Sequence, residues 1–105
     1  MRLHSKEIQA IQKAAQETFP SGTSVYLFGS RLDDQARGGD IDLLIEPQTS
    51  WSPQEIVERR TRFIATLYCL IEEQRIDVLI APAEAPDSRS VVDHARKHRI
   101  LLVQL

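Results

Sequence analysis

The chain contains very little cysteine and few aromatic residues. Its 105 residues include one cysteine, Cys69, and only 6% phenylalanine, tryptophan and tyrosine. One cysteine cannot form a disulfide within the chain, which excludes a disulfide-stabilised secreted scaffold and favours a reducing, cytoplasmic location. Cys69 falls in an apolar helical stretch, so we expect it to be a small buried side chain.

Long hydrophobic runs and a strong net charge are also absent. No segment approaches the ~18 continuous apolar residues of a membrane-spanning helix, and the first residues lack the apolar core of a signal peptide. The formal net charge is −2, whereas a protein that holds nucleic acid by itself needs a basic face for the phosphates. We therefore expect neither membrane insertion nor direct nucleic acid binding, which argues against a DNA or RNA polymerase.

The pattern of apolar residues predicts one α+β domain over residues 1–105. Helices are predicted over residues 5–19, 54–71 and 87–97, with Ser5 and Asp87 as N-caps, and a short helix after Gly29. Strands are predicted over residues 23–28, 40–46 and 75–80, while 100–103 is either an edge strand or a cover on the sheet. No repeat, low-complexity tract or linker interrupts the pattern. We expect a small mixed sheet of three to four strands with helices packed on it.

Three carboxylates stand out in two of the predicted strands. Asp40 and Asp42 are two residues apart in one strand, and Asp77 lies in the strand over 75–80. Side chains alternate across a strand, so Asp40 and Asp42 share a face, and Asp77 joins them if the two strands are neighbours. Hard divalent cations that act on phosphates are usually held by a few carboxylates. The acids therefore predict a magnesium site for phosphoryl or nucleotidyl transfer.

The residues before these acids are typical of a phosphate-binding turn. Gly29 ends an apolar run, and its missing Cβ lets backbone amides approach a phosphate closely. Ser30 stands where a helix could begin, as an N-cap beside free N–H groups that attract anions. Each feature alone is more often an ordinary turn or a solvated strand end. Only their combination with the three acids favours a functional site.

In combination, these motifs resemble the nucleotidyltransferase superfamily that includes DNA polymerase beta. Gly29-Ser30-Arg31 is followed by Asp40-Ile41-Asp42, with nine residues between Ser30 and Asp40, and Asp77 lies downstream. The chain is more narrowly similar to the minimal nucleotidyltransferase (MNT) domains of bacteria and archaea, often encoded beside a HEPN-domain partner as a toxin/antitoxin pair. The resemblance spans most of the chain and implies a palm-like fold of the polymerase beta type.

The resemblance also implies roles for the site residues. Gly29 and Ser30 would hold the β- and γ-phosphates of ATP. Asp40 and Asp42 would bind magnesium, with two ions expected, and Asp77 would be the third ligand and the candidate base for the incoming hydroxyl. In this scheme ATP is the substrate.

The loop before Asp40 departs from the family pattern. Many members carry Gly-Ser-Arg-Ala-Arg-Gly, whereas here Leu32-Asp33-Asp34 occupies the middle of that stretch and the gap to the first acid is shorter. Arg31 is retained, and Arg37, beside Gly38-Gly39, could supply a second cation to the phosphates. The departure bears on catalytic activity more than on fold.

The expected activity is the transfer of AMP from ATP to a hydroxyl, which in HEPN-paired relatives is a tyrosine of the toxin. The chain is too short for both a nucleotide site and a large acceptor domain, so a partner should supply the acceptor, in a homo- or hetero-oligomer. One alternative is an antitoxin that neutralises its partner by docking, with little turnover. A second is transfer to a small molecule, although those enzymes carry an added acceptor-binding region.

Trp51, in a polar loop, has two alternative interpretations. It could anchor a partner, because interfaces concentrate tryptophan. It could equally fold back on the core.

Overall fold

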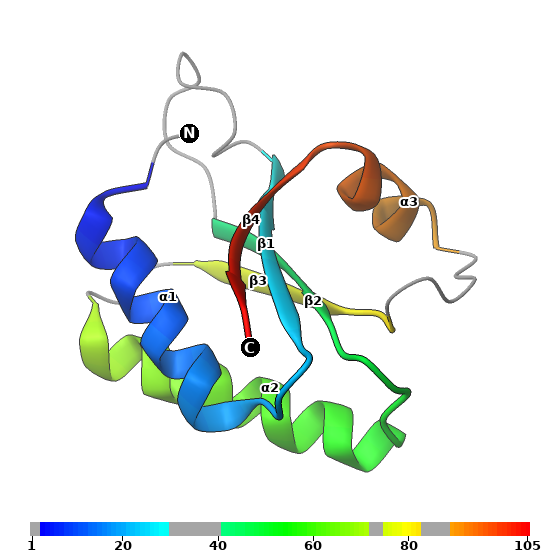
Figure 1. The fold of residues 1–105 in the computed structure, drawn as a ribbon, viewed down its shortest axis with the longest axis horizontal. Helices are drawn as coiled ribbons and strands as arrows, with labels where there is room; N and C mark the ends of the chain where they lie inside the picture. Colours follow the sequence, from blue (N-terminus) through cyan, green and yellow to red (C-terminus); the bar gives the residue numbers. More distant parts are fainter. Residues whose placement is uncertain (1–2, 30–40, 72–74, 83–88) are drawn as a thin grey trace.

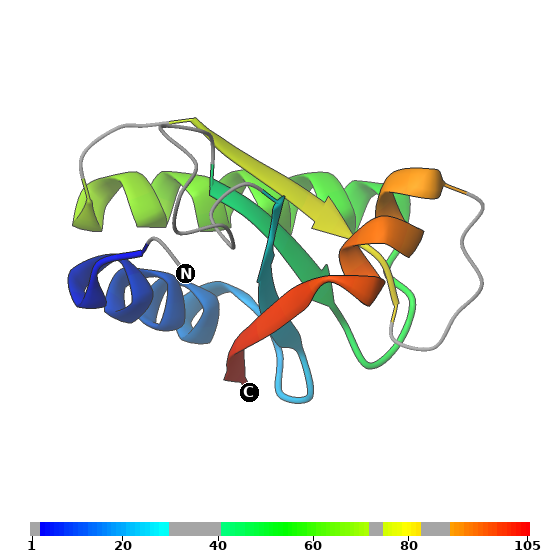
Figure 2. The ribbon, with the colours of Figure 1, turned by 90° about the horizontal axis from the view of Figure 1, so that it is seen from above.

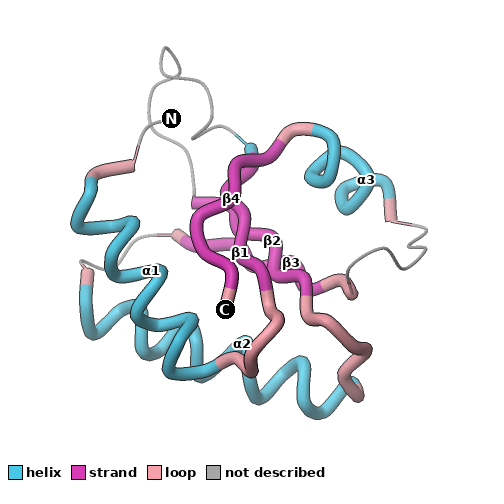
Figure 3. The backbone as a smooth tube through the Cα atoms, in the orientation of Figure 1, coloured by secondary structure: helices cyan, strands magenta, loops and turns pink. Residues whose placement is uncertain are grey.

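The computed structural model shows a four-stranded mixed sheet with helices on both faces, and it describes residues 3–29, 41–71, 75–82 and 89–105. In chain order the elements are α1 (Ser5–Thr18), β1 (Ser24–Phe28), β2 (Ile41–Glu46), α2 (Pro53–Leu70), β3 (Ile76–Ile80), α3 (Ser90–Lys97) and β4 (Arg99–Gln104). The strand order is β3-β2-β1-β4, with β2 and β3 parallel and the other neighbours antiparallel (Figures 1 and 3). The predicted α+β class is confirmed, and the stretch 100–103 belongs to an edge strand.

Helices α1 and α2 pack side by side on one face of the sheet, and α3 covers part of the other (Figure 2). The main core lies under α1 and α2, where alternate residues of β1, β2 and β3 point inward. Its fully buried members include Ile11, Ala14, Val25, Leu27, Ile41, Leu43, Ile45, Phe63 and Leu67. A smaller cluster under α3 comprises Phe28, Leu44, Ala81, Val92 and Ala95. The intervening strand residues, including Asp42 and Asp77, therefore belong to the α3 face.

Local hydrogen bonds define where the first two helices begin. The Ser52 hydroxyl accepts a hydrogen bond from the Glu55 N–H at 3.2 Å, and the Glu55 carboxylate accepts one from the Ser52 N–H at 3.3 Å. This reciprocal capping box places the start of α2 at Pro53. In α1 the carboxylate of Glu7 accepts a hydrogen bond from the His4 N–H at 3.1 Å. His4, and not the predicted Ser5, is therefore the N-cap of α1.

The third helix begins later than the sequence suggested. It starts at Ser90 with Arg89 at the N-cap position, so the predicted start at Asp87 is wrong. Arg89 is held in place by its guanidinium, which donates a hydrogen bond to the Ile80 carbonyl at 3.1 Å. None of the described helices is both long and apolar enough to span a bilayer.

The structure tests the predictions for two residues in or near α2, Cys69 and Trp51. Cys69 is exposed, so the prediction that it is buried is wrong. It lies two residues after the buried Leu67, which places it about 200° away around the helix and toward solvent. Trp51 packs back against the main core, with its ring stacked on Phe19 at a centroid distance of 5.8 Å. The fold-back interpretation of Trp51 therefore describes this structure.

Candidate functional site

Asp42 of β2 and Asp77 of β3 are direct neighbours across the parallel strand pair. The register aligns Asp42 with Asp77, which places their Cα atoms about 4.8 Å apart. Both follow a buried isoleucine, Ile41 or Ile76, and alternation turns the two carboxylates toward the opposite face of the sheet from α1 and α2. Asp42 is half-buried and Asp77 is exposed. The condition under which Asp77 joins Asp42, that their strands are neighbours, is therefore met.

Gly29 follows β1 directly and lies against Asp42. Its φ of +80° is in the left-handed region that residues with a side chain rarely adopt. A Cβ built on Gly29 would lie 3.0 Å from the Asp42 Cγ and 3.2 Å from its Cβ, with Oδ2 as its nearest neighbour. The glycine is thus required both by backbone conformation and by the close approach of the carboxylate. The positive φ is what the predicted turn at Gly29 requires, and the residues that would complete the turn lie outside the described residues.

A pocket of about 460 Å³ opens beside the two carboxylates. Its lining consists of Phe28, Asp42, Arg60, Asp77, Val78, Leu79 and Val91. The pocket therefore combines the end of β1, the start of β2 and the middle of β3 with the first turn of α3 and one arginine from α2. It offers two acidic groups, one cation and an apolar wall.

Arg60 comes to this pocket from the far side of the sheet. It belongs to α2, and its Nε donates a hydrogen bond to the Val78 carbonyl on the edge strand β3 at 3.3 Å. The side chain thus passes around the sheet edge and brings a positive charge to the acidic pocket.

The arginines of α2 differ in their surroundings. Arg59 forms an ion pair on the helix surface, with its guanidinium 3.7 Å from the Glu55 carboxylate. Arg60 was missed as a site residue. Its place in the sequence could have indicated this role. Arg60 lies four residues after Ile56 and three before Phe63, and both of these residues pack on the core between α2 and the sheet.

Four of the predicted site residues lie outside the described residues: Ser30, Arg31, Arg37 and Asp40. Asp40, one of the three predicted magnesium ligands, is therefore not described. Within residues 3–29, 41–71, 75–82 and 89–105, no group of three or more histidine, cysteine, aspartate or glutamate side chains is arranged to hold a metal ion. The described part of the site thus contributes two carboxylates.

The chemistry of these groups fits a hard divalent cation. Asp42 and Asp77 supply only oxygen donors, which suits magnesium better than a softer transition metal. Two carboxylates on adjacent strands also repel each other, and a cation between them removes that repulsion. Arg60 could neutralise a phosphate that approaches the same pocket.

Comparison of the chain with protein-family models and with curated proteins found no match.

Proposed function

We propose that this chain is a magnesium-dependent nucleotidyltransferase domain that transfers AMP from ATP to a hydroxyl group of a partner protein. The observation that carries the proposal is the pair of in-register aspartates, Asp42 and Asp77, with Gly29 packed against the first of them. The four-stranded mixed sheet and the order of its elements are compatible with a palm-like nucleotidyltransferase fold. The motif that joins Gly29-Ser30 to Asp40 and Asp42 supports the same activity.

Each residue has a defined task in this proposal. Asp42 and Asp77, with Asp40, would hold magnesium, which when bound neutralises phosphate charge and activates the attacking oxygen. The exposed carboxylate of Asp77 is also the candidate to accept the proton of the acceptor hydroxyl. Gly29 leaves its backbone open to a phosphate, which Ser30, Arg31 and Arg37 would help to bind.

The acceptor in this proposal is a tyrosine of a HEPN-type toxin, so that the chain acts as an antitoxin. The exposed position of Asp77 supports this acceptor, because a hydroxyl on a second protein can reach it from solvent. The resemblance to MNT domains supplies the type of partner.

Calorimetric titration with magnesium and an ATP analogue that has a non-cleavable α–β bridge tests the site. Asp42→Asn and Asp77→Asn should each weaken binding by more than about a hundredfold. Each removes a magnesium ligand and so leaves phosphate charge uncompensated, which costs several kcal/mol in a partly dry site. The melting temperature should stay within a few degrees of the wild-type value.

Asp93→Asn is the matched control for these variants. Asp93 is exposed on α3, where its carboxylate forms an i,i+4 ion pair with Lys97 at 3.1 Å. The Asp93→Asn variant should bind the analogue as the wild type does. Equal affinity in the wild type, Asp42→Asn and Asp77→Asn would remove the basis of the proposed function.

A further inference from the structure

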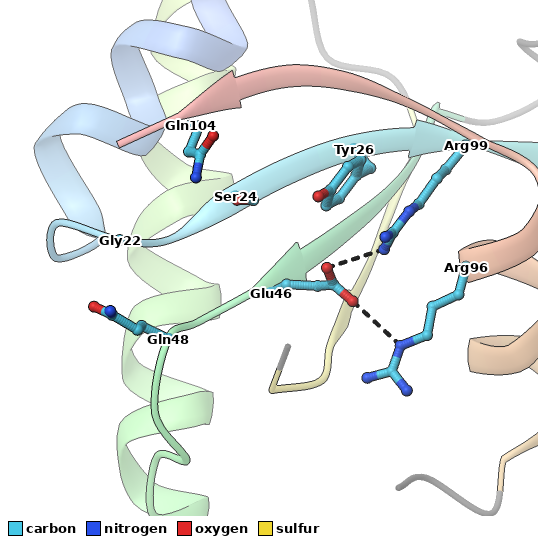
Figure 4. Close-up of a pocket in the computed structure, with 8 residues that line it drawn as sticks. All are labelled: Gly22, Ser24, Tyr26, Glu46, Gln48, Arg96, Arg99 and Gln104. Carbon is cyan, nitrogen blue, oxygen red and sulfur yellow. Dashed lines mark hydrogen bonds and ion pairs between the residues drawn. The ribbon is translucent and has the colours of Figure 1, made fainter. Parts of the chain in front are cut away.

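A second pocket, of about 650 Å³, lies on the same sheet face as the acidic pocket but shares no lining residue with it. Its lining consists of Gly22, Ser24, Tyr26, Glu46, Gln48, Arg96, Arg99 and Gln104 (Figure 4). Glu46 lies four residues after Asp42 in β2, so these two lining residues are about 13 Å apart along that strand. All the side chains of this second pocket carry polar groups.

Three charged residues meet in the second pocket. The carboxylate of Glu46 lies between two guanidinium groups, with Oε2 at 3.2 Å from the Arg96 Nε and Oε1 at 2.9 Å from the Arg99 Nη1 (Figure 4). The Glu46 side chain is only 6% exposed, whereas those of Arg96 and Arg99 are 23% and 27% exposed. The lining therefore has a formal charge of +1, and the positive groups are the more accessible ones.

Arg99 has two contacts on the protein side and remains partly exposed to the pocket. Its guanidinium carbon lies 3.9 Å from the centroid of the Tyr26 ring, a cation–π contact. Its buried Nη1 lies 2.9 Å from the Glu46 carboxylate, as an ion pair without the angles of a regular hydrogen bond. The side chain is nevertheless 27% exposed, so the rest of the guanidinium can donate hydrogen bonds to an acceptor in the pocket.

Neutral polar groups surround this arginine. The side chains of Ser24, Tyr26, Gln48 and Gln104 make no hydrogen bond within the described part of the chain. They come from β1, β4 and the segment after β2, and they supply both donors and acceptors. Such groups suit the hydroxyls or amides of a polar molecule. An apolar ligand would leave them unpaired, and a metal cation would be repelled by the two guanidinium groups.

We infer that the second pocket binds a small polar molecule with one phosphate or carboxylate group, which Arg99 recognises through its guanidinium. The tyrosine ring and the buried carboxylate pre-orient the guanidinium, and the four neutral side chains bind the rest of the molecule. This binding involves no residue of the acidic pocket, so it holds or fails independently of the proposed nucleotidyl transfer.

The test is a heteronuclear NMR titration in the absence of magnesium with three probes: inorganic phosphate, gluconate and ribose 5-phosphate. Saturable shifts should appear at the Arg99 side chain and at Tyr26, and ribose 5-phosphate should bind more tightly than inorganic phosphate if the anion is a phosphate. A response to gluconate alone would assign the ligand to the carboxylate class.

Two variants and one control give the test its specificity. Arg99→Gln should weaken binding about tenfold or more, since it removes a charge-assisted hydrogen bond. Tyr26→Phe removes only a hydroxyl and should weaken ribose 5-phosphate binding about twofold to fivefold, which covers the case that Arg99→Gln folds poorly. Arg62→Gln, on the exposed surface of α2, should bind as the wild type does.

Two results would overturn the inference. The first is the absence of saturable shifts in the second pocket with any of the three probes. The second is unchanged affinity in folded Arg99→Gln or Tyr26→Phe. Either would leave the cluster of Glu46, Arg96 and Arg99 with a purely structural role.

Discussion

Two glycines in the described chain have positive φ values, and they differ in what surrounds them. Gly22 has a φ of +90°, and a Cβ there would meet the flexible side chain of Gln48. Gly29 has a φ of +80° and would place its Cβ against Asp42. Backbone strain is therefore similar at the two positions, but only Gly29 adjoins a carboxylate of the candidate site.

This difference allows a controlled test with Gly29→Ala and Gly22→Ala. Each variant should lose about 1–3 kcal/mol of stability, because alanine is strained at positive φ. Only Gly29→Ala should also lose affinity for the magnesium–ATP analogue, by about tenfold or more, since its Cβ displaces Asp42. Urea denaturation measures the first effect and calorimetry the second. Equal nucleotide affinity in the two variants would mean that Gly29 has no part in nucleotide binding.

The residues of the acidic pocket differed in how far the sequence could reveal them. Asp42 and Asp77 were predictable because strand alternation is strict and both acids interrupt apolar runs. Their pairing still depended on β2 and β3 being neighbours, which the structure shows. Arg60 was not predictable from residue type, because its role depends on a long side chain that turns around the sheet edge to Val78.

At the scale of elements, Glu46 connects three parts of the fold. It ends β2, and its carboxylate forms ion pairs with Arg96 of α3 and Arg99 of β4. Arg96 also donates a hydrogen bond from Nη2 to the Pro82 carbonyl at 2.7 Å. The cluster thus fixes α3 over the sheet face that carries both pockets. Its electrostatic value is reduced by solvent, because about a quarter of each arginine side chain is exposed.

Glu46→Gln should therefore lower the free energy of unfolding by about 1–3 kcal/mol, less than the loss of a fully buried ion-pair partner. The substitution leaves two arginines without their carboxylate and loosens α3. Glu17→Gln, at an exposed position of α1, should change stability by less than about 0.5 kcal/mol. Chemical denaturation of both variants gives the comparison. A Glu46→Gln variant as stable as Glu17→Gln would mean that α3 is held by its apolar contacts alone.

The elements themselves were largely predictable, and the errors have local causes. The apolar periodicity indicated the three helices and the strands, but the last helix begins at Ser90 because Arg89 takes the N-cap position and bonds to β3. The apolar run over residues 100–103 does not alternate, so the sequence alone does not distinguish an edge strand from a cover on the sheet. The structure pairs this run with β1, with a register shift between Val25 and Tyr26 that explains the broken alternation.

At the scale of the whole molecule, the two faces of the sheet have different roles. One face is buried under α1 and α2 and supplies most of the core. The other is only partly covered by α3 and carries both the acidic pocket and the second, basic pocket. In the proposed function an acceptor protein approaches this second face, where Asp77 is exposed.

Label transfer to the partner tests nucleotidyl transfer most directly. The chain is incubated with magnesium, the protein encoded by the neighbouring gene, and ATP labelled at either the α- or the γ-phosphate. The α-label should appear on a tyrosine of the partner, with a mass gain of one or more AMP units, and should be lost in Asp42→Asn and Asp77→Asn but kept in Asp93→Asn. A stable complex with bound nucleotide and no mass gain would contradict the account in favour of docking alone, and transfer of the γ-label would instead indicate a kinase.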